Sequence, residues 1–164
     1  MRSLVIIANN IRSTYNVGAI FRTADGFGVE HIYLTGITPY PQTTNDPRLP
    51  HLSQKLTKQI DKIALGAINT VSWSFKTNLI QLISVLKKDG FRIIGLEQAK
   101  NSIKLHKYTP AKKSAILLGS EINGISASLL ALCDDVIEIS MYGQKESFNV
   151  AQATAIALYA LREA

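Results

Sequence analysis

The sequence predicts an α/β protein with a mainly parallel sheet covered by helices on both faces. Short apolar runs of strand length alternate with stretches of helical periodicity along the chain, and this alternation is typical of parallel sheets flanked by helices. The 164 residues suit one domain with its own core, and 46% hydrophobic against 18% charged residues is a globular composition. We therefore expect a single domain over residues 1–164.

Six apolar runs are predicted to be strands because each is short, rich in branched aliphatic or aromatic residues, and bounded by polar residues or glycine. In chain order they are 3–8 (SLVIIA), 31–34 (HIYL), 70–73 (TVSW), 91–96 (FRIIGL), 114–119 (SAILLG) and 135–140 (DVIEIS). Helices are predicted where apolar residues recur every three or four positions. These stretches lie near 16–27, 57–66, 76–88, 125–132 and 148–163.

The first predicted helix carries an arginine beside its apolar face. Val17, Ile20, Phe21 and Ala24 share one face of this helix, and Arg22 lies next to them. The helical pattern alone suggests a solvated arginine whose aliphatic stem covers the surface. A functional role for Arg22 therefore needs support from the rest of the chain.

Three polar loops follow predicted strands, at the position where open parallel sheets bind their ligands. They read NNIRSTYN, GSEINGIS and MYGQKESFN, after the first, fifth and sixth strands. The third leads into the alanine-rich last helix, where Ser147 is an N-cap candidate. Capping alone would also explain Ser147 and Asn149. Residues 36–56 hold four of the five prolines, and so long a connection is usually functional or mobile.

The positive charge of the chain is concentrated in one segment. Residues 87–113 hold eight lysines and arginines against two acidic residues, and the whole chain has a formal net charge of +6. A positive patch favours polyanions, of which nucleic acid is the commonest. Charge alone is equally compatible with a solvated loop.

Several other classes of site are disfavoured by the motifs. The chain has neither a G-x-G-x-x-G nor a G-x-x-x-x-G-K-[ST] phosphate loop, and no G-x-S-x-G nucleophile elbow. His31, His51 and His106 have no ligand spacing with Cys133, so we expect no metal. Cys133 is interpreted as a structural residue. The five-residue apolar run at the N-terminus is too short for a signal peptide or a membrane span, and we expect a cytoplasmic protein.

Three segments together resemble the sequence motifs of one enzyme family. NIRSTYNVGAIFRTADGFGV, LLGSEINGIS and ISMYGQKESFNVAQATAIALY look like the three motifs of the SpoU (TrmH) class of SPOUT RNA ribose 2′-O-methyltransferases, in the family's order. Two departures are small, because a phenylalanine stands at Phe148 where leucine is common, and Ile122 or Asn123 replaces a second glycine. The larger departure is length, because many relatives carry an additional RNA-binding domain, whereas we expect no separate RNA-binding domain here.

The resemblance implies a Rossmann-like fold whose C-terminal part forms a deep trefoil knot, an exception to the usual absence of knots. It further implies a homodimer whose active site uses both protomers, and S-adenosylmethionine bound by the knotted loops. The implied cofactor-binding residues are Leu96, Glu97, Gly119, Ile139, Met141, Ser147 and Phe148.

By the same resemblance, Arg22 is the arginine of the first motif and acts on the ribose 2′-hydroxyl. Because a guanidinium stays protonated in proteins, its role is expected to be phosphate binding and stabilisation of the developing alkoxide. Asn16 would orient Arg22 or the ribose. The implied catalytic residues are Arg22, Asn16, Glu121, Ser147 and Asn149, and the candidate RNA-binding residues are Arg12, Arg22, Lys104, Lys107 and Lys112.

The expected activity is therefore methyl transfer from S-adenosylmethionine to an RNA ribose, with tRNA favoured as the substrate. Ribosomal RNA is the alternative within the class. An inactive RNA-binding protein and a small-molecule nucleotide-binding domain are alternatives of other classes. The four polar residues Arg22, Glu121, Ser147 and Asn149 speak against the first of these, since a pure binder does not need all of them.

Overall fold

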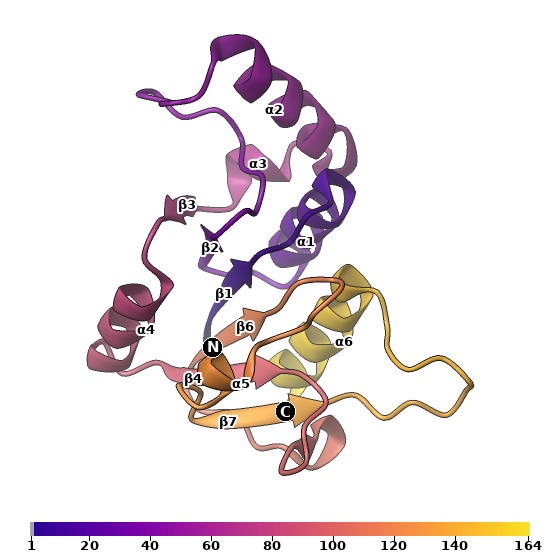
Figure 1. The fold of residues 1–164 in the computed structure, drawn as a ribbon. Helices are drawn as coiled ribbons and strands as arrows, with labels where there is room; N and C mark the ends of the chain where they lie inside the picture. Colours follow the sequence, from indigo (N-terminus) through magenta and orange to yellow (C-terminus); the bar gives the residue numbers. More distant parts are fainter. Residues whose placement is uncertain (1) are drawn as a thin grey trace.

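Seven parallel strands form one sheet in the computed structural model, which describes residues 2–164 (Figure 1). The strand order is β3-β2-β1-β6-β4-β7-β5, and every neighbouring pair in it is parallel. The predicted parallel sheet is thereby confirmed. The strands are β1 (Ser3–Asn9), β2 (His31–Thr35), β3 (Trp73–Lys76), β4 (Arg92–Leu96), β5 (Ile103–Lys104), β6 (Lys113–Leu118) and β7 (Asp135–Glu138).

Helices cover both faces of this sheet. As a result, alternate side chains of β1 pack in two separate hydrophobic cores. Leu4 and Ile6 pack in one core with side chains of α1, α2 and α6, whereas Val5 and Ile7 pack in the other with side chains of α4. The helices are α1 (Thr14–Gly26), α2 (Pro50–Ala64), α3 (Ala67–Thr70), α4 (Leu79–Lys88), α5 (Ala127–Leu130) and α6 (Val150–Glu163), with a short 3-10 helix at Leu105–Lys107.

Two elements begin at other residues than the sequence predicts. Helix α2 begins at Pro50, seven residues before the predicted start, because a proline at the first helical position loses no intrahelical hydrogen bond. Strand β3 begins at Trp73, since residues 67–70 form α3 instead of the start of a strand. The two-residue strand β5 has no signal in the sequence. The trefoil knot stays a prediction.

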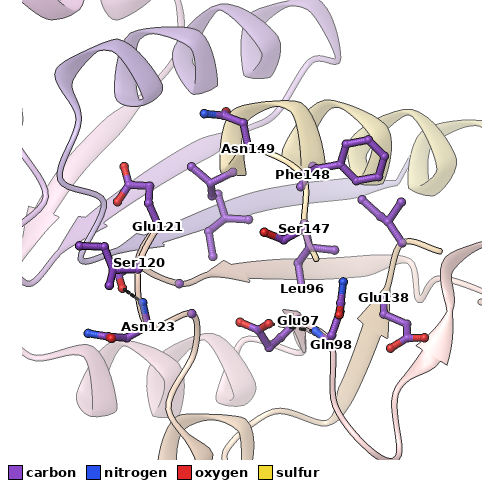
Figure 2. A pocket seen from close by; sticks show the side chains of 17 residues that line it. Leu96, Glu97, Gln98, Ser120, Glu121, Asn123, Glu138, Ser147, Phe148 and Asn149 are labelled. Atoms are coloured by element: carbon purple, nitrogen blue, oxygen red, sulfur yellow. Dashed lines mark hydrogen bonds between the residues drawn. The ribbon is translucent and has the colours of Figure 1, made fainter. Parts of the chain in front are cut away.

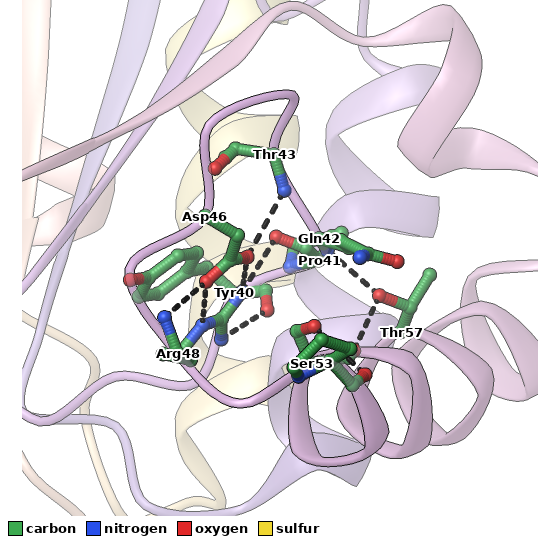
Figure 3. A network of polar contacts seen from close by, with 9 residues as sticks. Tyr40, Pro41, Gln42, Thr43, Asp46, Arg48, Ser53 and Thr57 are labelled. Carbon is green, nitrogen blue, oxygen red and sulfur yellow. Dashed lines mark hydrogen bonds and ion pairs between the residues drawn. The ribbon is translucent and has the colours of Figure 1, made fainter.

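Arg48 makes the largest set of contacts within the proline-rich loop before α2 (Figure 3). The guanidinium of Arg48 binds the Asp46 carboxylate and donates to the backbone oxygens of Tyr40 and Pro41 at 2.9 and 3.1 Å. It also lies 3.5 Å from the centre of the Tyr40 ring, which stacks on Phe75. The hydrogen bond from Arg48 lowers the pKa of Asp46 well below its ordinary value. The loop is therefore held by defined contacts at the start of α2.

Helices α1 and α2 approach closely at Gly18. A methyl group added at Gly18 would lie 2.5 Å from the Ile60 backbone oxygen and 2.8 Å from Ile63 Cβ. Only glycine allows this separation without a shift of one helix. This contact fixes α1, which carries Asn16 and Arg22, against the outer helix α2.

Candidate active site

A pocket of about 570 Å³ opens beyond the carboxyl ends of β4, β6 and β7 and beside the start of α6 (Figure 2). This is where ligands bind in open parallel sheets, because the loops diverge there. The lining is made of Leu96, Glu97, Gln98, Leu118, Gly119, Ser120, Glu121, Ile122, Asn123, Gly124, Glu138, Ile139, Ser147, Phe148, Asn149, Val150 and Ala153.

One wall of the pocket is a tight hairpin at residues 119–125. Ser120 and Gly124 exchange two backbone hydrogen bonds of 3.2 and 2.9 Å. A Cβ at Gly119 would lie 2.3 Å from the carbonyl carbon of Gly124, so no larger residue fits there without a change in the hairpin. Gly124 has a positive φ of 62°, which glycine adopts at little cost.

Glu97 fastens this hairpin to the loop after β4. Its carboxylate accepts hydrogen bonds from the backbone amides of Ile125 at 2.9 Å and of Gln98 at 3.0 Å. The same carboxylate lies so close to Gly124 that an added Cβ would be 2.2 Å from it. Glu97 therefore shapes the pocket wall through the backbone on both sides.

Glu121 projects from the hairpin and binds the start of α1. Its carboxylate accepts from the backbone amides of Arg12 at 2.9 Å and Ser13 at 3.2 Å, and from Asn16 Nδ2 at 2.9 Å. Burial by itself would raise the pKa of Glu121, but these hydrogen bonds outweigh it and hold the pKa below its ordinary value. The charged form of Glu121 thus fastens α1 to the pocket.

Asn149, and not Ser147, is the N-cap of α6. The side-chain oxygen of Asn149 accepts from the backbone amide of Ala151 at 2.9 Å, which corrects the assignment of the cap to Ser147. The physical reason is that α6 begins at Val150, two residues later than predicted. The amide nitrogen of Asn149 donates to Asn16 Oδ1 at 3.0 Å. Ser147 is therefore released from capping, and its side chain lines the pocket (Figure 2).

Arg22 lies apart from the pocket of its own chain. It is exposed on α1, six residues beyond Asn16, which places it about 9 Å along the helix and a third of a turn away. The side chain of Arg22 makes no hydrogen bond or ion pair within residues 2–164, and Arg22 does not line the pocket. The Asn16 side chain binds Glu121 and Asn149.

Of the seven residues predicted to bind a cofactor, all except Met141 line the pocket. Sequence reasoning missed Gln98, which also lines it and donates to the Glu146 backbone oxygen. Its position directly after Glu97 is the only signal that could have found it.

The candidate RNA-binding residues are of two kinds. Lys104 forms an ion pair with Glu138, which lowers the pKa of that carboxyl. Lys107, Lys112 and Arg12 have no ion pair among residues 2–164. Within the basic segment, Lys87 and Arg92 are likewise paired, with Asp134 and Asp135. The uncompensated charge is therefore smaller than the sequence count suggests.

The pocket has an unusual charge balance for a nucleotide site. Three of its lining residues are glutamates, and none is a lysine or an arginine. A phosphate group would meet repulsion there, whereas a ligand with a positive charge would be stabilised. Among the described residues, no group of three or more His, Cys, Asp or Glu side chains is arranged to hold a metal ion. Burial raises the pKa of the Cys133 thiol to about 11, which fits its structural interpretation.

Residues 3–159 match the model of the SpoU rRNA Methylase family. This chain belongs to that family. The match extends from β1 into the last helix, so it includes every lining residue of the pocket.

Similar proteins include a tRNA (guanosine(18)-2′-O)-methyltransferase of Aquifex aeolicus, which is 28% identical over 96% of this chain. The chain spans 68% of that relative, and 57% of the length of Staphylococcus aureus relatives that are 32% identical.

Solved structures agree with the fold. A TrmH/SpoU tRNA modifying enzyme of A. aeolicus superposes with a TM-score of 0.81 at 26% identity, covering 99% of this chain and 75% of that one. An AdoMet-bound rRNA methyltransferase of Sinorhizobium meliloti also reaches a TM-score of 0.81, at 22% identity. It covers 98% of this chain and 56% of that chain. The predicted SPOUT-type arrangement of a parallel sheet with helices is thereby confirmed.

Proposed function

We propose that this protein transfers a methyl group from S-adenosylmethionine to a ribose 2′-hydroxyl of RNA. The observation that carries the proposal is the pocket at the carboxyl ends of β4, β6 and β7, with three glutamates and no cationic residue in its lining. Membership of the SpoU rRNA Methylase family supports the same chemistry.

The lining fits S-adenosylmethionine in shape and in charge. Leu96, Ile139 and Phe148 provide apolar contacts for an adenine, and the glycines 119 and 124 bring backbone within reach of a ligand. The carboxylates of Glu97 and Glu121 give the pocket negative charge that favours a sulfonium, whereas the charge of Glu138 is compensated by Lys104. When bound, S-adenosylmethionine would supply a methyl group activated by a positively charged sulfur.

Arg22 is proposed to hold the RNA. Its guanidinium stays protonated and can bind a phosphate through two parallel hydrogen bonds. The same charge would stabilise a ribose oxygen as it loses its proton. The network of Asn16, Glu121 and Asn149 keeps α1 and α6 fixed, and positioning of this kind supplies much of the rate in group transfer.

The proposed assembly is a homodimer in which Arg22 serves the pocket of the other copy. One observation in support is that Arg22 is exposed and lies outside the pocket of its own chain. A second is that large apolar side chains are exposed on α1, which carries Arg22, and on α6. Tyr15 on α1 is 61% exposed, as is Tyr159 on α6, and Ile156 is 37% exposed. An isologous contact of α1 and α6 with a second copy would cover them.

The proposed substrate is tRNA and the proposed compartment is the cytoplasm. The A. aeolicus relative is named as a tRNA enzyme, and exposed cations near the pocket edge, such as Arg12, suit a phosphate backbone. None of the helices in the described part of the chain is long and apolar enough to cross a bilayer.

The test is transfer of a radiolabelled methyl group to tRNA and, separately, to rRNA from cells that lack the gene, followed by nucleoside analysis. We expect label in a 2′-O-methylnucleoside of the tRNA pool. Label only in rRNA would overturn the choice of substrate. Cofactor binding without transfer to either pool would contradict both substrates, and absence of cofactor binding would overturn the enzymatic function.

A further inference from the structure

The loop that connects β7 to α6 has little to hold it. Figure 1 shows residues 140–149 extending away from the sheet before they return to α6. Residues 142–149 are exposed, and Tyr142 reaches 94%. Among residues 2–164, one hydrogen bond alone joins residues 140–148 to the rest of the protein: Gln98 Nε2 donates to the Glu146 backbone oxygen at 2.6 Å.

Gln98 is itself well anchored for this contact. Its backbone amide donates to the carboxylate of Glu97 at 3.0 Å, and the other oxygen of that carboxylate accepts from Ile125. The backbone of Gln98 is therefore tied to the hairpin at residues 119–125. The side chain extends from this fixed base toward the β7 to α6 loop (Figure 2).

The Gln98 contact closes a ring of hydrogen bonds around the pocket. Glu97 joins the loop after β4 to the hairpin, and Glu121 joins the hairpin to α1. Asn16 then joins α1 to Asn149 at the start of α6. Asn149 is connected to Glu146 through the backbone of residues 146–149. The hydrogen bond from Gln98 to the Glu146 oxygen then closes the ring.

We propose that Gln98 is a positioning residue that latches the β7 to α6 loop and so fixes Ser147 and Phe148 in the pocket wall. The ligand side of this inference rests on the proposed function. The latch needs a hydrogen-bond donor at the end of a long side chain, because the acceptor is a carbonyl oxygen. A glutamate of nearly the same shape lacks that donor, whereas a lysine retains one.

The first measurement is hydrogen exchange of the amides of residues 142–149 in the protein without cofactor. We expect faster exchange in Gln98→Ala and Gln98→Glu than in the wild type, and exchange close to wild type in Gln98→Lys. Gln144→Ala is the matched control, since Gln144 is exposed in the same loop and its side chain makes no hydrogen bond in the described chain.

The second measurement is the affinity and dissociation rate of S-adenosylmethionine. Gln98→Ala should bind about tenfold more weakly, which corresponds to the loss of one hydrogen bond, while its melting temperature without cofactor stays near wild type. A tenfold loss in Gln98→Ala without faster exchange of residues 142–149 would mean direct contact of Gln98 with the ligand and would overturn the latch.

The two measurements also separate this inference from the proposed function. Faster loop exchange in Gln98→Ala, together with no cofactor binding by the wild type, would leave the latch in place and refute the proposed cofactor. Cofactor binding by the wild type with unchanged loop exchange in every Gln98 variant would refute the latch alone.

Discussion

Asn16 and Asn149 bind each other through their side-chain amides although 133 positions separate them in the chain. Asn149 Nδ2 donates to Asn16 Oδ1 at 3.0 Å. Asn16 Nδ2 is directed at Glu121 and Asn149 Oδ1 at the Ala151 amide, so each group has a partner of the matching kind. Because an amide has one donor side and one acceptor side, this network permits a single orientation of both side chains.

Replacement of Asn16 tests this orientation. Asn16→Ala is expected to lower the free energy of unfolding by about 1–3 kcal/mol, since partners of a buried amide are left unsatisfied. Asn16→Asp should cost more at pH 7 because it places a second carboxylate beside Glu121. Urea denaturation of both variants measures the difference, and equal stability of the two at pH 7 would contradict the assigned network.

The charge of Glu121 gives a pH dependence of known sign. Its pKa is lowered in the folded protein, so its stabilising effect is complete above the ordinary pKa of about 4.3 and is lost as the pH falls through the folded value. Glu121→Gln should be less stable than the wild type by about 1–2 kcal/mol at pH 7, allowing for solvent screening. The gap should shrink below pH 4, as followed by urea denaturation at several pH values. A gap independent of pH would be inconsistent with a charged Glu121.

Mixed dimers test the proposed sharing of Arg22. Arg22→Ala is expected to abolish methyl transfer while the affinity for S-adenosylmethionine changes less than twofold, because Arg22 lies outside the pocket of its own chain. Asn149→Ala is also expected to be inactive. When equal amounts of the two variants exchange subunits, half of the dimers are mixed and hold one intact site of two, so about a quarter of the wild-type rate should return. Persistent inactivity of the mixture would place Arg22 in its own protomer's site.

Gly18 tests the contact between α1 and α2. Gly18→Ala should lower the free energy of unfolding by about 1–3 kcal/mol, because the added methyl overlaps the Ile60 backbone oxygen. Gly26→Ala is the matched control on the same helix, since nothing lies within 4 Å of a Cβ there. It should be neutral or stabilise by up to about 1 kcal/mol. Thermal unfolding of both variants measures these changes. An unchanged free energy of unfolding in Gly18→Ala would show that the two helices move apart at no cost.

The sequence was informative where one local pattern determines the structure. The strands β1, β2, β4, β6 and β7 begin or end within two residues of their predictions because branched apolar runs have clear polar borders. The first half of α2 was missed because prolines around Pro50 are typical of a loop, although the last one starts a helix. The predicted position of β3 is three residues too early, because α3 and β3 lie in one continuous apolar stretch of the sequence.

The candidate site could be predicted only in part for a different physical reason. Motifs led to Glu97, Gly119 and Ser147, which the structure places around one pocket. The partners of these residues depend on how distant segments meet, and no local pattern contains that information. The contact of Gln98 with Glu146 depends on such a meeting of distant segments. The position of Arg22 outside the pocket of its own chain does so too.

The centre of the sheet has a consequence for how the chain acquires its structure. Strand β1 pairs with β6 along six residues, from Ser3 with Lys113 to Ala8 with Leu118. Contacts between such distant segments form slowly, since a long loop must close before they yield any stabilisation. During synthesis, β1 leaves the ribosome long before its central partner exists. Until then, the edge of β1 that β6 will occupy has unpaired backbone N–H and C=O groups, and the nascent chain is exposed to aggregation at this stage.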